Sequence, residues 1–318
     1  MSIEVVLHQM IIIFVLILIG LFLHKKSLFN ENTSRQISSL IVNFCNPALL
    51  ICSVFDEGPK ASGQELLTGA FLVLLAYAIL LLCGYLLPHI LKVPAKDHFA
   101  YRLITIYGNV SFIGIPLASA VLGPGSLIYV SLNNLVYNFL IYTHGLSVIR
   151  KAAGIEEKKT EDFLSRLKML TKKCINIGTV SAAVTLILYL CDFGVPTLIS
   201  DTLSSIGRCA TFLSMLVLGV SVAQMPLRDI FTHGRLYIFT LLRMILLPIG
   251  CVFLFRLFTD NALIINTTAL LLAVPVGNMP LILSKEYGIN HPVISRGIIL
   301  TTLLSVITIP LVTMLISA

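Results

Sequence analysis

Two glycine-asparagine pairs lie inside long apolar stretches of the sequence, where a membrane helix favours neither residue. One pair opens the segment 108–116 and the other lies within 275–280, and Asn278 follows Asn109 by 169 residues (278 − 109). Their amides can both donate and accept hydrogen bonds. The neighbouring prolines predict interrupted helices, because proline lacks an N–H and its ring clashes with the turn before it. The residues expected at the two interruptions are Gly108, Pro116, Pro275, Gly277 and Pro280.

Interrupted backbone at membrane depth is tolerated only where it is buried in protein or lines a water-filled cavity. If the two interruptions face each other, two half-helix N-termini point into one cavity with partial positive charge, which suits an anionic group. Interrupted segments at matching positions of two halves are typical of secondary transporters built from inverted repeats. A pair of ordinary proline kinks is the alternative, and the shared Gly-Asn pairs at this spacing favour the site.

The composition places these segments in a membrane. Hydrophobic residues make up 57% of the 318-residue chain and charged residues 12%, whereas soluble domains have roughly 25% charged residues. Apolar stretches near the length of about 20 residues that crosses the hydrocarbon core recur along the chain. The fold class expected is an all-α polytopic membrane protein with ten transmembrane helices. The predicted spans are 5–23, 36–55, 66–91, 99–122, 126–149, 173–191, 198–223, 236–258, 262–284 and 293–317.

The one sizeable hydrophilic stretch divides these spans into five and five. We therefore expect a first five-helix repeat at 1–149, a cytoplasmic linker at 150–172 and a second five-helix repeat at 173–318. An odd number of spans in each repeat inverts the second copy relative to the first. Of the 22 Lys and Arg residues, 18 fall in segments that this topology assigns to the cytoplasm. The positive-inside rule then places both termini outside, with the chain as a multi-pass protein of the cell membrane.

Three motifs in this sequence resemble the auxin efflux carrier family, which includes plant PIN-type auxin carriers and bacterial malate or malonate permeases. They are Asn46-Pro47-Ala48-Leu49-Leu50, Gly108-Asn109 through Pro116-Leu117, and Val276-Gly277-Asn278-Met279-Pro280. The resemblance covers nearly the whole chain. It implies a 5+5 inverted repeat similar to bile-acid sodium symporters and NhaA-type antiporters, with crossed, broken helices 4 and 9. It also implies scaffold and transport domains that move in an elevator-like manner, and a homodimer.

The same resemblance implies that the crossover asparagines contact a substrate carboxylate. The substrate-binding residues that we predict are Asn109, Asn278, Asn46, Asn134, Asn138 and Ser111. The alternative for Asn46 is a kink with a hydrogen-bonded amide, and the alternative for Asn134 and Asn138, one turn apart on one face, is a polar contact between helices. Arg208 and Arg243 also fall inside predicted spans, where either contacts substrate or reaches a lipid headgroup. His8 and His144 are expected to be hydrogen-bonded core residues rather than proton relays.

The leading functional hypothesis is a secondary active transporter or uniporter of small organic anions, which are mono- or dicarboxylates or auxin-like compounds. No acidic side chain lies deep in any predicted span, which disfavours a cation/proton antiporter. A sodium-coupled organic-anion symporter of the bile-acid type, a channel and a transporter-like membrane sensor remain alternatives. We expect no enzyme activity, since neither a Gly-x-Gly-Asp pair nor a His-Glu-x-x-His helix is present. We also expect no metal, no cofactor and no nucleic-acid partner; the partners are an organic anion and the lipid bilayer.

Overall fold

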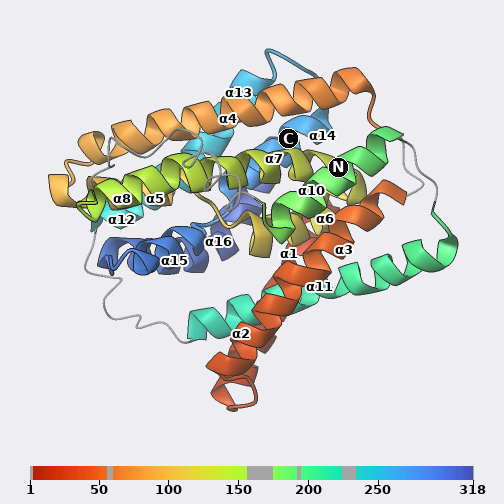
Figure 1. The fold of residues 1–318 in the computed structure, drawn as a ribbon, viewed down its shortest axis with the longest axis horizontal. Helices are drawn as coiled ribbons and strands as arrows, with labels where there is room; N and C mark the ends of the chain where they lie inside the picture. Colours follow the sequence, from red (N-terminus) through yellow and green to blue (C-terminus); the bar gives the residue numbers. More distant parts are fainter. Residues whose placement is uncertain (1–2, 56–59, 156–174, 192–194, 224–233, 318) are drawn as a thin grey trace.

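Helices make up almost all of the regular structure (Figure 1). The computed structural model describes residues 3–55, 60–155, 175–191, 195–223 and 234–317. Within these ranges, each predicted span coincides with one helix or with consecutive helices in the chain. Most of the predicted linker, 150–172, and the first residues of the predicted second repeat lie outside the described ranges.

The helices of the two halves follow one another with short connections. Those of the first half are α1 (Ile3–Lys25), α2 (Glu31–Leu40), α3 (Asn46–Cys52), α4 (Gly63–Ile90), α5 (His98–Ile106), α6 (Ile115–Leu122), α7 (Leu127–Leu140) and α8 (Leu146–Ala152). Those of the second half are α10 (Ile177–Cys191), α11 (Thr197–Ala223), α12 (Gly234–Leu241), α13 (Leu247–Phe255), α14 (Ala262–Ala273), α15 (Met279–Glu286) and α16 (Pro292–Ser317).

Four π-helical turns occur within the described ranges, and each runs directly into the α-helix that follows it. They are Ile41–Cys45, Val110–Gly114, Ile141–Gly145 and Leu242–Leu246. Three of the four precede a helix with proline in its first turn, namely Pro47, Pro116 and Pro248. Proline offers no N–H to the carbonyl one turn earlier, and the wider i→i+5 turn accommodates that loss. Turns of this kind occur frequently at functional sites.

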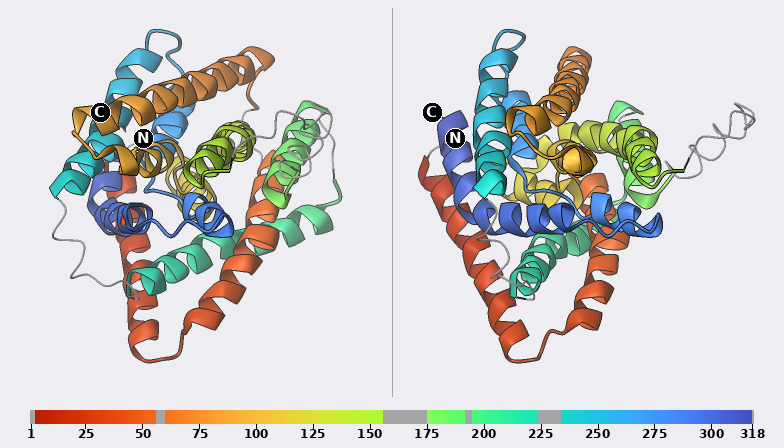
Figure 2. Two further views of the ribbon diagram at one scale, coloured as in Figure 1. Left: turned by 60° about the vertical axis from the view of Figure 1, so that its left-hand side comes forward. Right: turned by 90° about the vertical axis from the view of Figure 1, so that its left-hand side faces the viewer.

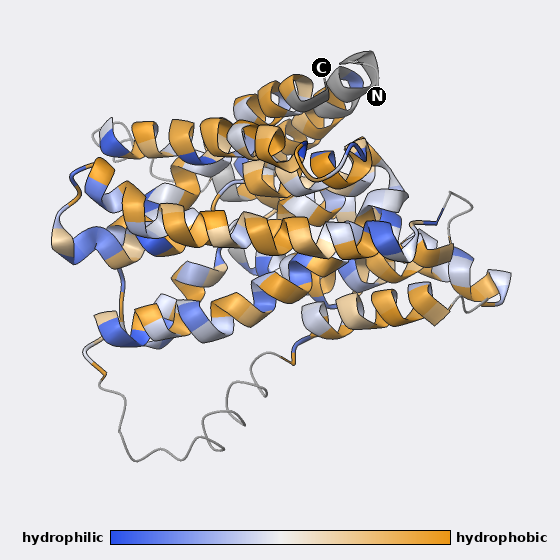
Figure 3. Cartoon of the chain, turned by 90° about the horizontal axis from the view of Figure 1, so that it is seen from above, coloured by the Kyte–Doolittle hydropathy of each residue, from blue (hydrophilic) through white to orange (hydrophobic). Residues whose placement is uncertain are grey.

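Hydrophobic residues, drawn in orange, predominate in the long helices, with hydrophilic residues interspersed among them (Figure 3). In the part of the chain that the structure describes, five helical segments are long and apolar enough to cross a membrane: Asn32–Phe55, Gly63–Ile90, Thr197–Val220, Gly234–Phe255 and Pro292–Leu315. Shorter apolar helices accompany them, such as Ala262–Ala273. Large apolar side chains such as those of Leu67 and Leu82 are exposed, as expected for surfaces that face lipid. The chain is therefore a polytopic, all-helical membrane protein.

Helix α11 joins α1 and α3 into one group, which forms a V at one side of the molecule (Figure 2). At the crossing of α11 with α1, a Cβ on Gly219 would overlap the backbone near Ile17, and one on Gly20 would overlap the Leu216 carbonyl. Small residues permit membrane helices to approach this closely. We call α1, α2, α3 and α11 the V group. The interrupted helices pack with α4, α7, α13 and α16, and α6 also packs against α1, α3 and α11 of the V group.

Candidate functional site

The two predicted interruptions lie against each other. We call their paired residues, 107–109 and 275–277, the crossover. One main-chain hydrogen bond runs from the Asn109 N–H to the Pro275 carbonyl at 2.7 Å, and a second runs from the Gly277 N–H to the Tyr107 carbonyl at 2.9 Å. They flank an isolated antiparallel bridge. Backbone groups freed by the breaks therefore find partners in each other, as membrane depth requires.

The close approach at the crossover requires glycine on both sides. A Cβ on Gly277 would lie 2.7 Å from the Gly108 carbonyl oxygen, and a Cβ on Gly108 would lie 2.8 Å from Cγ2 of Val274. Pro116 and Pro280 lie in the first turns of α6 and α15, where a missing N–H is tolerated. The glycines permit the crossing. Pro280 lies at the start of its second half-helix, whereas Pro116 follows the π-helical turn Val110–Gly114 with which the other second half-helix begins.

A buried arginine links the C-termini of the first half-helices, α5 and α14. Arg243 lies in the π-helical turn between α12 and α13 and is 1% exposed. Its Nε donates to the Thr105 carbonyl at 2.7 Å, and its Nη1 donates to the Leu272 carbonyl. These carbonyls belong to the last turns of α5 and α14, where helix dipoles place partial negative charge. Arg243 thus contacts backbone, whereas the other intramembrane arginine, Arg208, is exposed and donates to Ser204 Oγ at 3.1 Å.

A polar cavity of about 490 Å³ opens beside the crossover, between the V group and helices α15 and α16. Its polar lining residues are Ser34, Ser38, Asn109, Ser214, Asn278, Lys285, Ser295 and Thr302. Its apolar lining residues are Phe112, Val217, Leu218, Leu281, Ile298 and Ile299. Among these described residues Lys285 is the one formal charge, and none is acidic. The cavity is therefore suited to a polar solute of negative charge.

Asn109 and Asn278 both line this cavity, at equivalent positions before the second half-helices. The Asn109 Oδ1 accepts the Phe112 N–H at 3.3 Å, so its amide NH₂ is the group that can donate to a solute. Asn278 is the N-cap residue of α15, and its side chain makes no capping hydrogen bond. The positive ends of two half-helices therefore border the cavity, while Arg243 satisfies their negative counterparts in α5 and α14.

Asn46 and Ser111 lie next to the cavity but are not among the residues that line it. The buried Asn46 side chain donates from Nδ2 to the Ser111 carbonyl at 2.6 Å. Its Oδ1 is buried and has no hydrogen-bond partner among the described residues. This bond connects the V group to the interrupted segment that follows Asn109.

Asn134 and Asn138 lie elsewhere, where α7 packs on α10. The Asn134 Nδ2 donates to the Gly178 carbonyl at 3.3 Å, and the Asn138 Oδ1 accepts from Asn176 Nδ2 at 3.2 Å. The structure does not bring these two residues to the cavity, because the face of α7 that they share is turned toward α10. Their hydrogen bonds join helices, a common use of asparagine in membrane proteins.

Lys285 and the serines that line the cavity were not among the residues predicted from the sequence. Lys285 follows Asn278 by seven residues, two turns of helix, so both belong to one face of α15. That spacing was a usable signal. His144 is hydrogen-bonded, as expected, whereas His8 is exposed rather than part of the core.

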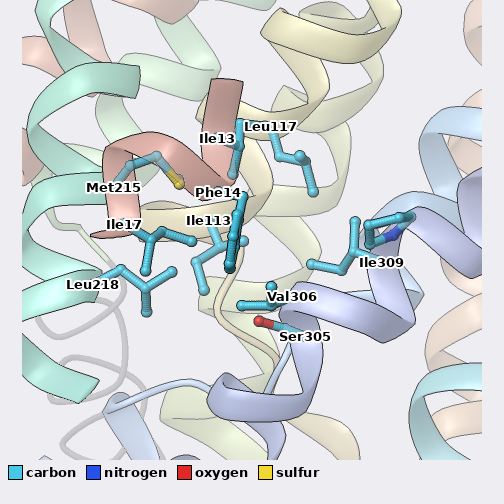
Figure 4. A pocket seen from close by; sticks show the side chains of 11 residues that line it. Ile13, Phe14, Ile17, Ile113, Leu117, Met215, Leu218, Ser305, Val306 and Ile309 are labelled. Carbon is cyan, nitrogen blue, oxygen red and sulfur yellow. The ribbon is translucent and has the colours of Figure 1, made fainter. Parts of the chain in front are cut away.

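An apolar hollow of about 30 Å³ adjoins the polar cavity (Figure 4). Ile13 and Ile17 of α1 and Leu218 of α11 line it from the V group, and Leu117 and Ile309 line it from α6 and α16. Leu218 lines the polar cavity as well. Hydrocarbon side chains therefore make the contact between the V group and the remaining helices at this point.

Comparisons with known proteins agree with a transporter. The family described as "Membrane transport protein" matches residues 5–313. The chain is 22% identical over 305 residues to the uncharacterized transporter MJ1031 of Methanocaldococcus jannaschii, covering 95% of this chain and 96% of that protein. It is 20% identical over 310 residues to the uncharacterized transporter YfdV of Escherichia coli K12, covering 94% of each. A protein of Rhizobium meliloti named "Putative malonate transporter" is 22% identical over 209 residues, covering 64% of this chain and 62% of that protein.

Proposed function

The chain belongs to the membrane transport protein family, the auxin efflux carrier and PIN-like family that its motifs predicted, and we propose that it carries small organic anions across the cell membrane. The observation that carries this proposal is the polar cavity beside the crossover. Two half-helix N-termini, the Asn109 and Asn278 amides and the Lys285 ammonium border it, and none of its described lining residues is acidic.

The proposed substrate is a mono- or dicarboxylate. Its carboxylate oxygens accept hydrogen bonds from the amide NH₂ groups of Asn109 and Asn278 and from N–H groups at the half-helix N-termini. Lys285 attracts the anion and pairs with it at the cavity edge. A volume of about 490 Å³ suits a small solute with some of its water. The printed name of the Rhizobium meliloti relative, which mentions malonate, is in line with a dicarboxylate.

In this proposal the chain crosses the membrane ten times as two inverted five-helix repeats, with both termini outside. The cavity lies between the V group and the helices that hold the crossover, so relative movement of these two parts changes which side the substrate reaches. The apolar contact shown in Figure 4 favours such sliding, because few polar bonds break. The hydrogen bond from Asn46 to the Ser111 carbonyl joins the two parts, so this movement breaks it and Asn46 then donates to another acceptor.

The position of Arg243 favours transport without sodium. In transporters with interrupted helices, unwound carbonyls and half-helix C-terminal ends coordinate the coupling cation. Here carbonyls at both C-terminal ends, those of Thr105 and Leu272, accept hydrogen bonds from Arg243. A permanent guanidinium thus provides the positive charge that a sodium ion supplies elsewhere. This argues against the alternative function, a sodium-coupled organic-anion symporter of the bile-acid type.

The test is uptake of labelled malonate into proteoliposomes containing Asn109→Ala or Asn278→Ala. Loss of one hydrogen bond to a charged group costs about 1.5–3 kcal/mol, so uptake at low substrate falls roughly 10- to 100-fold with protein still in the membrane. Asn134→Ala is the matched control and retains uptake, since Asn134 bonds α10 instead. Wild-type uptake by either crossover variant refutes the assignment, and lack of saturable counterflow in wild type indicates a channel or sensor.

A further inference from the structure

A second cavity, of about 870 Å³, lies where the loop after α4 and the helices α5 and α8 come together. The side chains that matter for its chemistry are Tyr85, Lys96, His98, Arg102, His144 and Lys151. Three of them are permanent cations, and none of the described lining residues is acidic. The nearest carboxylate in sequence, that of Asp97, is engaged by His291 Nε2 at 3.1 Å. As far as the described residues line it, the cavity therefore favours an anion.

Arg102 presents an unused donor at this cavity. Its guanidinium carbon lies 4.3 Å from the centroid of the Tyr85 ring, an arrangement that orients the planar group. Its Nε is buried and has no hydrogen-bond partner among the described residues. A buried donor without an acceptor is costly. The rigid guanidinium fork matches the paired oxygens of a phosphate group better than a lone ammonium does.

The surroundings of the cavity are those of a lipid rather than of a free solute. Tyr85 is 42% exposed, and Leu82 and Leu86 on the same helix are also exposed, so the basic cavity continues into the apolar outer surface of α4. The exposed Lys96 and Lys151 complete its polar side. Basic pockets at the ends of membrane helices bind phosphate-bearing lipid headgroups. We propose that this cavity binds the phosphate group of an anionic phospholipid whose acyl chains lie along α4.

A chain of hydrogen bonds connects the phosphate cavity to the crossover. The Tyr85 hydroxyl lies 3.2 Å from His144 Nε2, and His144 Nδ1 lies 3.0 Å from the Tyr107 hydroxyl, which donates to the Leu140 carbonyl at 2.9 Å. Because Tyr107 donates to Leu140, its oxygen accepts from Nδ1–H, and Nε2 accepts from Tyr85. One neutral tautomer satisfies all of these bonds. A bound phosphate orders Arg102 and Tyr85 and thereby supports Tyr107, whose carbonyl pairs with Gly277.

The first test is a thermal scan of delipidated wild-type protein with phosphatidylglycerol or phosphatidylcholine, and it does not depend on transport. Phosphatidylglycerol at about 100 times its Kd raises the melting temperature by roughly 5 °C, whereas phosphatidylcholine leaves it unchanged. The double variant Arg102→Gln/Lys151→Gln loses this rise. The matched control, Lys25→Gln/Lys26→Gln, removes two cations at the end of α1 and retains it.

Three results would overturn the proposal: equal stabilisation by both lipids, a rise retained in Arg102→Gln/Lys151→Gln, or the same rise with glycerol 3-phosphate alone, which identifies a soluble phosphate ester instead. The connection to the crossover is tested by hydrogen exchange of peptides that contain Gly277. Phosphatidylglycerol slows this exchange in wild type but not in Tyr107→Phe, which still retains the lipid in native mass spectrometry. Unchanged exchange in lipid-bound wild type rules out the connection.

Discussion

Replacing Arg243 with methionine removes the side chain that pairs both first half-helices at their C-termini. Two charge-assisted hydrogen bonds are lost, at about 1.5–3 kcal/mol each, and the Thr105 and Leu272 carbonyls become buried without donors. Methionine fills the space with little strain. The expected loss of stability is about 3–5 kcal/mol, similar to breaking a buried ion pair. At about 2 °C for each kcal/mol in a large domain, the melting temperature of the purified protein in detergent falls by roughly 6–10 °C.

Two further variants make this experiment decisive. Arg208→Met removes an exposed arginine that donates to Ser204, and it shifts the melting temperature by no more than about 1 °C. The melting temperature of Arg243→Lys is expected between those of Arg243→Met and Arg208→Met, because an ammonium keeps the charge but lacks the planar fork that reaches two carbonyls. If Arg243→Met has the melting temperature and the transport rate of the wild type, the guanidinium does not hold the crossover together.

Three other outcomes are expected. Gly277→Ala places a Cβ 2.7 Å from the Gly108 carbonyl oxygen and destabilises the protein by about 1–3 kcal/mol or more, whereas Gly250→Ala, with nothing within 4 Å of its Cβ, melts no lower than wild type. Lys285→Gln raises the KM for uptake about two- to five-fold at low salt and less at high salt, because an exposed charge is screened; an unchanged KM contradicts its role at the cavity edge. Malonate uptake by wild type is equal in sodium and choline buffers, and a strict sodium requirement contradicts the reading of Arg243.

The interruptions were predictable from the sequence because proline and glycine act on the backbone next to them. Pro116 and Pro280 disfavour a regular α-helix through the turn before them, whatever surrounds them. The apolar stretches likewise predicted the helices, since length and hydropathy are local properties. That Asn109 and Asn278 share a cavity followed from the matching positions of the two interruptions, which is a relation between segments that the sequence does display.

The partners of Arg243 could not be predicted in this way. Its acceptors are main-chain carbonyls 138 and 29 residues away, and every residue type carries such a carbonyl, so no letter of the sequence marks them. Asn134 and Asn138 show a related limit. Their spacing correctly places both on one face of α7, but which neighbour that face meets depends on how the helices pack. Here the neighbour is α10.

The π-helical turns have a consequence for comparing this chain with its relatives. Each turn contains one residue more than an α-helical turn, so a relative with an unbroken α-helix aligns only across a single-residue gap within Ile41–Cys45, Val110–Gly114, Ile141–Gly145 or Leu242–Leu246. Deleting that residue rotates everything beyond it by about 100°. A relative with a deletion within Leu242–Leu246 can therefore have an arginine close to Arg243 in the alignment whose side chain no longer points toward the crossover. Relatives without the deletion keep the arginine in that direction.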